Sequence, residues 1–142
     1  MSFHEKSAWT CLVTTIVVFV PYFAYIFQLF LRGELLAPLV LTMLAAAVLF
    51  QVILISVAHT WFIIRSGQKQ DERDIAIQSK SFRNAYFALA SSIWIIWIVV
   101  FIAPWSAPLR DFLAFGQALL LCFILAEVTH YLTQIICYRR GS

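Results

Sequence analysis

The fold of this chain is decided by long apolar runs, and the clearest is FLAFGQALLLCFILAEVTHYLTQIICY, residues 112–138, whose single charged residue is Glu127. A helix needs about 20 apolar residues to cross a hydrocarbon layer of about 30 Å. Three further runs of this kind lie at about 8–31, 35–64 and 83–104. We therefore predict an all-α polytopic membrane protein in which one domain, residues 1–142, contains four transmembrane helices.

The composition excludes the main alternatives to a membrane protein. Hydrophobic residues make up 63% of the 142 residues and charged residues only 12%, whereas about a quarter of an average soluble domain is charged. A disordered chain needs low hydrophobicity and high net charge, and three cysteines are too few for a disulfide scaffold. The runs also lack the polar alternation of a membrane barrel, which leaves helices as the expected spans.

The links between the runs predict two hairpins and their orientation. Short links follow the first and third runs, so each pair should form a hairpin, and a polar loop, 65–81, joins the two pairs. Basic residues accumulate on the cytoplasmic side of membrane proteins. Here they predict that both termini and the 65–81 loop are cytoplasmic, with Lys6, Arg65, Lys69, Arg73, Lys80, Arg83, Arg139 and Arg140 on that side and Arg32 and Arg110 on the other. Because topology accounts for the net charge of +3, no nucleic-acid partner is predicted.

Similar residue patterns in the two halves indicate an internal repeat of the hairpin. Ala8-Trp9-x-x-Leu12-x-Thr14-Thr15-Ile16 has the same spacing as Ala85-Tyr86-x-x-Leu89-x-Ser91-Ser92-Ile93, and Val57-x-His59 matches Val128-x-His130. Duplicated hairpins would have the same orientation in the membrane. The alternative is coincidence, since apolar segments use few residue types.

The first run carries a polar face. Thr10, Thr14, Pro21, Tyr25 and Gln28 recur at separations of three, four and seven residues, which places them on one side of a helix. Polar side chains form hydrogen bonds between packed membrane helices. We therefore expect this face to point into the helical bundle.

The fourth run holds the most informative polar group, Glu127, about 18 Å along the helix from the basic residues that follow the run. A bare carboxylate near mid-depth costs roughly 2.5 kcal/mol or more, so we expect it to be protonated, paired or facing water. Tyr131, His130 and Gln134 extend the polar sector, and His59 of the second run has a similar depth. These five residues form the candidate intramembrane site.

Three interpretations of this site remain open. In the first, Glu127 forms a hydrogen bond to His130, His59 or a hydroxyl and fixes the packing of the helices. In the second, Glu127 exchanges protons for a cation or small solute, as in small four-helix exporters. In the third, His59 and His130 are axial ligands of a haem, or bind a metal ion together with Glu127.

Motifs of familiar enzymes are missing from the sequence. It contains no glycine-rich phosphate loop, no nucleophile motif and no His-Glu-x-x-His motif. We expect a non-enzymatic accessory or self-associating helical bundle without a cofactor, with the lipid bilayer and itself or another membrane protein as partners. The alternatives are the proton-coupled exporter that uses Glu127 and the haem- or metal-binding protein that uses His59 and His130.

The polar loop contains a charged motif, Asp71-Glu72-Arg73-Asp74-x-x-Ile77, before the third run. It resembles the Asp-Glu-Arg motif before a transmembrane helix in small four-helix bacterial inner-membrane proteins of uncharacterised domain families. The resemblance implies a bacterial inner-membrane location and a loop that docks to the cytoplasmic mouth of the bundle or to a partner. The alternative interpretation is a solvated segment that caps the third helix.

Overall fold

A computed structural model of the chain describes residues 3–34, 37–66, 71–102 and 111–140, without the side chains of 3–4, 37, 59 and 61–66. Within these residues the fold consists of four helices: α1 (Phe3–Arg32), α2 (Ala37–Ser66), α3 (Glu72–Ile102) and α4 (Phe112–Arg140). Each is long and apolar enough to cross a membrane, and the described part contains no strand. The prediction of an all-α integral membrane protein with four spans is confirmed.

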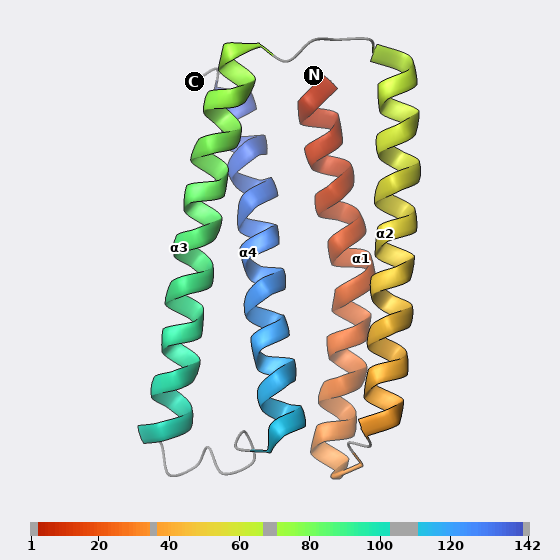
Figure 1. Ribbon diagram of the computed structural model, residues 1–142, viewed down its shortest axis with the longest axis vertical. Coiled ribbons are helices and arrows are strands. Elements are labelled where there is room, and N and C mark those ends of the chain that lie inside the picture. Colours follow the sequence, from red (N-terminus) through yellow and green to blue (C-terminus); the bar gives the residue numbers. More distant parts are fainter. Residues whose placement is uncertain (1–2, 35–36, 67–70, 103–110, 141–142) are drawn as a thin grey trace.

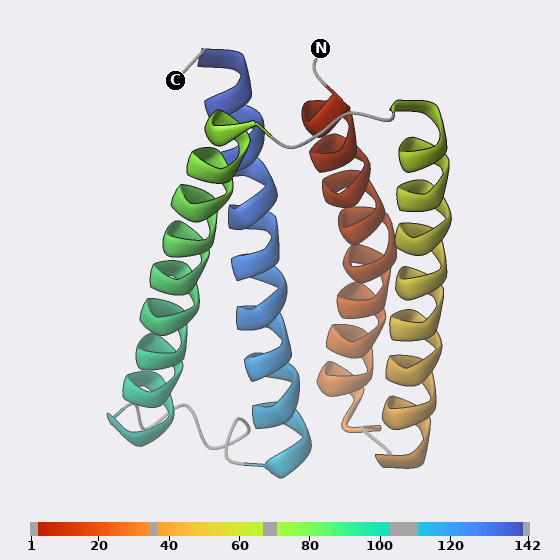
Figure 2. The same ribbon diagram turned by 45° about the horizontal axis from the view of Figure 1, so that its top comes forward.

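The helices lie side by side in the order α3, α4, α1, α2 (Figures 1 and 2). The hairpins α1–α2 and α3–α4 each pack along their length, and α1 against α4 joins them. Helix α1 begins and helix α4 ends at the same end of the molecule, called here the terminal end (Figure 1). The two inner helices therefore each have two neighbours, whereas α2 and α3 lie at the edges.

Helix α1 is buried through large apolar side chains rather than through its polar face. Leu12, Phe19 and Ile26 are among its buried residues, and they belong to the side that contacts α2 and α4. A lipid-embedded helix gains from close packing of shape-matched side chains, because lipid tails solvate an apolar face as well as another helix does. Packing therefore selects this face.

The expectation that the polar face of α1 points inward was wrong. Pro21, Tyr25 and Gln28 are exposed, and Thr10 and Thr14 are only partly buried. The Thr14 hydroxyl donates to the carbonyl oxygen of Thr10 at 2.9 Å. Because a threonine in a helix can satisfy its hydroxyl on its own backbone, Thr10 and Thr14 need no neighbouring helix.

The edge helices are largely exposed. Among the described residues of α2, Val40 and Gln51 are buried, and the buried residues of α3 are Ile77, Ser81 and Val100. The remaining outward side chains are mainly apolar, as expected for a surface that faces hydrocarbon.

The charged motif starts α3 and ties it to α4. The backbone N–H of Glu72 donates to Asp71 Oδ1 at 2.7 Å, and that of Asp71 donates to Asp74 Oδ2 at 3.2 Å, so both aspartates cap backbone N–H groups at the start of the helix. The Tyr138 hydroxyl at the end of α4 donates to Asp74 Oδ1 at 3.0 Å. The cap explains why residues 72–81, expected in the cytoplasmic loop, are helical.

A second contact joins the start of α1 to the end of α4. Arg139 Nε lies 3.4 Å from the buried Glu5 carboxylate, and the Arg139 guanidinium lies 5.4 Å from the centroid of the Trp9 ring. Together with the Asp74–Tyr138 bond, this contact fastens α1 and α3 to α4 at the terminal end.

The predicted repeat relates α1 to α3 and α2 to α4. The related helices differ in their surroundings, because α1 packs against two helices and α3 mainly against α4. If the hairpins arose by duplication, their inner and outer helices have exchanged roles.

Candidate functional site

A partly open cavity of about 280 Å³ lies between α1, α2 and α4. Four of its lining residues carry polar groups: Thr15 from α1, Gln51 from α2, and Glu127 and Tyr131 from α4. The remaining lining residues are apolar, namely Phe19, Val48, Val52, Ile55, Leu120, Phe123 and Ile124. The combination of an apolar wall with a few polar groups is typical of a site for a small molecule.

The cavity opens sideways near the middle of the membrane. Thr15, Gln51 and Glu127 lie near the middles of their helices. The rim residues Val52 and Phe123 are 55% and 51% exposed, so the opening is on the lateral surface. Polar groups at such an opening are poorly solvated by hydrocarbon, and they favour an occupant that can pair with them.

A chain of polar contacts crosses the cavity wall. Gln51 Nε2 donates to Thr15 Oγ1 at 2.9 Å, and the Thr15 hydroxyl donates to the carbonyl oxygen of Cys11 at 2.8 Å. The Tyr131 side chain interacts with both Glu127 and the Cys11 thiol. Within the described part of the chain, Gln51 Oε1 is buried without a hydrogen-bond partner.

His130 belongs to the interface between α3 and α4. Its ring packs on Phe82, with 4.3 Å between the centroids. The Gln134 amide nitrogen lies 3.1 Å from His130 Nε2, so the amide donates and the ring nitrogen accepts. The hydrogen of a neutral ring is then on Nδ1, which is buried and has no partner among the described residues.

The structure therefore separates the residues that the sequence grouped into one site. Glu127 and Tyr131 line the cavity, whereas His130 and Gln134 pair with each other and do not line it. The rings of His130 and Tyr131 are in edge contact at 5.3 Å, so the two sectors of α4 adjoin.

The side chain of His59 lies outside the described residues, and haem ligation by His59 and His130 stays a prediction. Within the described ranges, no group of three or more His, Cys, Asp or Glu side chains could hold a metal ion.

Gln51 and Thr15 were not predicted as site residues from the sequence. Gln51 is the one amide side chain in the run 35–64, and an amide in the middle of an apolar span is a signal that could have found it. Thr15 is harder to find, because it differs from Thr14 only in the direction of its side chain.

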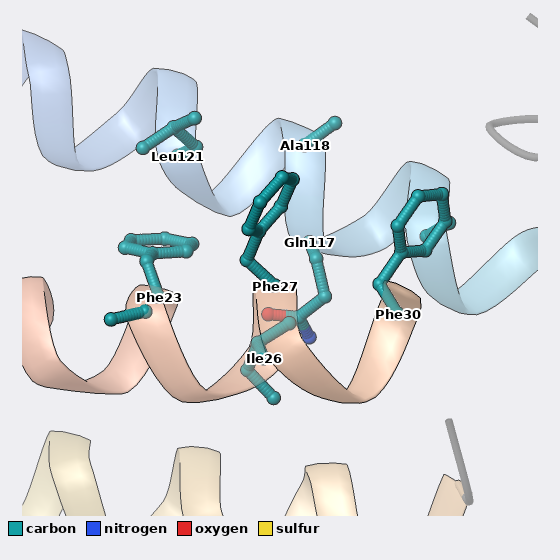
Figure 3. A pocket seen from close by; sticks show the side chains of 9 residues that line it. Phe23, Ile26, Phe27, Phe30, Gln117, Ala118 and Leu121 are labelled. Atoms are coloured by element: carbon teal, nitrogen blue, oxygen red, sulfur yellow. The ribbon is translucent and has the colours of Figure 1, made fainter. Parts of the chain in front are cut away.

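A larger cavity of about 450 Å³ lies between α1 and α4 in the half away from the terminal end. Figure 3 shows the rings of Phe23, Phe27 and Phe30 beside α4. The polar Gln117 at this cavity accepts a hydrogen bond on Oε1 from the Tyr22 hydroxyl at 2.8 Å. An acyl chain of the surrounding lipid can fill such an apolar space, so the cavity at Glu127 is the stronger candidate site.

The motif at the start of α3 acts structurally here. Asp71 and Asp74 accept hydrogen bonds from backbone N–H groups at the start of the helix, and Asp74 also accepts one from the Tyr138 hydroxyl, while Glu72 and Arg73 are exposed. Comparison with models of protein families, with curated proteins and with solved structures finds no match to this chain.

Proposed function

We propose that this membrane protein binds small organic cations at Glu127 and carries them in exchange for protons. The observation that supports the proposal is the lateral opening of the cavity at mid-depth, lined by the Glu127 carboxylate. A charge at this depth requires a partner, and an organic cation supplies one while its apolar part contacts the cavity wall.

Exchange follows from the chemistry of one carboxylate. Glu127 can hold a proton or form an ion pair with a cation, but it cannot do both. Arrival of the proton therefore releases the cation, and arrival of the cation releases the proton. Tyr131, which interacts with Glu127, is placed to orient the carboxylate in either state.

The size of the cavity limits the substrate. An apolar cavity of about 150 Å³ holds a benzene molecule, so 280 Å³ holds a phenyl ring with a short chain that ends in a cationic nitrogen. Phenethylammonium and its trimethylated derivative are therefore suitable probes.

Transport into proteoliposomes tests the proposal. The trimethylated probe cannot lose a proton and cross the bilayer as a neutral amine, so its uptake reports the protein. We expect an acidic lumen to drive uptake by the unaltered protein and by Glu72→Gln, which changes an exposed carboxylate, but not by Glu127→Gln. Equal uptake by Glu127→Gln and the unaltered protein would exclude Glu127 as the exchanging group.

A second proposal is self-association, and the position of α2 at an edge of the fold supports it. Its residues Val48 and Val52 line the cavity and are 42% and 55% exposed, so a second copy that packs on this face would cover the lateral opening. In this proposal the protein is a non-enzymatic accessory bundle whose partner is itself.

Oxidative cross-linking tests the second proposal. The three native cysteines are buried, so an added cysteine reports its own surroundings. We expect Val52→Cys to cross-link into dimers in the membrane and Val17→Cys, on the exposed side of α1, not to do so. Equal cross-linking of the two variants would indicate random collision.

We further propose that the terminal end faces the cytoplasm of a bacterial inner membrane. Six described basic residues lie toward this end and are exposed, namely Lys6, Arg73, Lys80, Arg83, Arg139 and Arg140, while Arg32 lies at the opposite end. This distribution agrees with the positive-inside rule. A reporter enzyme that is active only in the cytoplasm should then be active when it is fused after α4. A reporter that is active only outside the cytoplasm should be inactive at the same position.

A further inference from the structure

Gln51 lines the cavity and carries a hydrogen-bond acceptor that has no partner among the described residues. The residue is only 9% exposed, and its Oε1 atom is buried without a partner within the described residues. A buried acceptor that has lost its water costs about 1–3 kcal/mol. A ligand that donates a hydrogen bond to this oxygen therefore gains more than one that does not.

The neighbouring groups fix the direction of the Gln51 amide. Its Nε2 atom donates to Thr15 Oγ1 at 2.9 Å, and Thr15 is held in turn by its bond to the Cys11 carbonyl oxygen at 2.8 Å. Since Thr15 uses its hydroxyl hydrogen on Cys11, it can accept from the amide nitrogen only. The amide oxygen is then the atom left for a ligand.

The cavity therefore offers a ligand hydrogen-bond acceptors on two helices. Glu127 presents carboxylate oxygens, and Gln51 presents Oε1. The Tyr131 hydroxyl, the other polar group, interacts with Glu127 and Cys11. Two acceptors from different helices suit a nitrogen that carries at least two hydrogens, one for each oxygen.

We propose that Gln51 makes the site selective for primary and secondary ammonium groups over quaternary ones. The ammonium forms an ion pair with Glu127 and donates a second hydrogen bond to Gln51 Oε1, while its aromatic or branched body contacts the apolar wall. This inference rests on the cation binding proposed above and adds the residue that sets its selectivity.

An alkali metal ion is the main competing occupant, because it also binds oxygen atoms. It would leave most of the 280 Å³ cavity without a partner for the apolar wall. The organic ammonium uses both parts of the site, and we therefore favour it.

Calorimetric titration of the purified full chain in detergent tests the selectivity. The probes are phenethylammonium and its trimethylated derivative, which has the same charge and ring but no N–H group. In the unaltered protein we expect the first to bind about tenfold more tightly, the value of one charge-assisted hydrogen bond. In Gln51→Leu we expect this preference to be smaller, because only the hydrogen bond to Glu127 then distinguishes the two probes, while both still bind through the charge of Glu127.

Gln117→Leu is the matched control, because the oxygen of Gln117 is already occupied by Tyr22. This variant should keep the preference of about tenfold that is expected for the unaltered protein. If Gln51→Leu does not fold, Gln51→Met has a closer shape and the same expected result.

Several outcomes would overturn the inference and leave the proposed function standing. One is equal binding of the two probes by the unaltered protein, and another is a preference that is just as large in Gln51→Leu. In both cases Glu127→Gln would still abolish binding. Stoichiometric displacement of both probes by sodium or potassium ions would assign the site to a metal ion instead. If neither probe binds to any of these proteins, the proposed function is contradicted as well.

Discussion

Two adjoining sectors of α4 carry polar residues and use them differently. On the side of α1 and α2, Glu127 and Tyr131 surround empty space with Gln51. On the side of α3, His130 is packed against Phe82 and bonded to Gln134. Polar groups with an unmet partner beside a cavity indicate a binding site, whereas polar groups that are closely packed indicate a structural contact.

The largest change in the free energy of unfolding is expected at Ser81 of α3, on the side where α3 and α4 pack together. This residue has no exposed surface, and a small side chain allows close approach of two membrane helices. We expect Ser81→Leu to lower the free energy of unfolding by about 1–3 kcal/mol through overpacking, as measured by denaturant titration in bicelles.

The matched control for this prediction is Ser79→Leu, an exposed position in the same helix, for which we expect a change within about 0.5 kcal/mol. Equal stability of the two variants would mean that α3 and α4 are not closely packed at Ser81.

A smaller effect is expected on the cavity side, at Thr15. Thr15→Val keeps the shape but removes the acceptor of the Gln51 amide, which should cost about 1 kcal/mol of stability. The freed amide can turn, so we also expect the preference for phenethylammonium to fall. Thr14→Val, which removes bonds to backbone carbonyls only, should keep the preference, and the same loss in both variants would contradict the proposed role of Thr15.

The smallest effect is expected at His130. His130→Phe retains an aromatic ring against Phe82 and removes both the bond to Gln134 and the unpartnered Nδ1 atom. Loss of the hydrogen bond destabilises the fold, whereas loss of the buried atom without a partner stabilises it. The free energy of unfolding should therefore change by about 0.5 kcal/mol or less. Loss of probe binding in this variant would show that the two sectors of α4 act as one site.

The fold could be predicted from the sequence because long apolar runs identify helices that span a membrane. The early start of α3 follows from the capping residues Asp71 and Asp74, which come before the apolar run 83–104. The inward face of α1 was not predictable from Thr10, Thr14 and Gln28, because the hydrophobic effect does not direct polar faces inward within lipid.

The candidate site could be predicted only in part. Glu127 is the one acidic residue within the apolar run 112–138, and its cost in lipid identifies it. The grouping with His130 was based on their separation along one helix, and it could not reveal that Gln51 of another helix faces the same cavity. Which oxygen of the site lacks a partner depends on the direction of side chains, which sequence does not record.

Solid-state magnetic resonance on the protein in lipid bilayers can detect the proposed ion pair between the bound cation and Glu127. The measurement is the distance between the nitrogen of isotope-labelled phenethylammonium and the labelled carboxylate carbons of the glutamates. If the ammonium pairs with Glu127, one cross-peak should report a distance of about 4 Å, the range of an ion pair, and this cross-peak should be lost in Glu127→Gln. Bound probe without a contact to any glutamate carboxylate, or a cross-peak that persists in Glu127→Gln, would contradict the account.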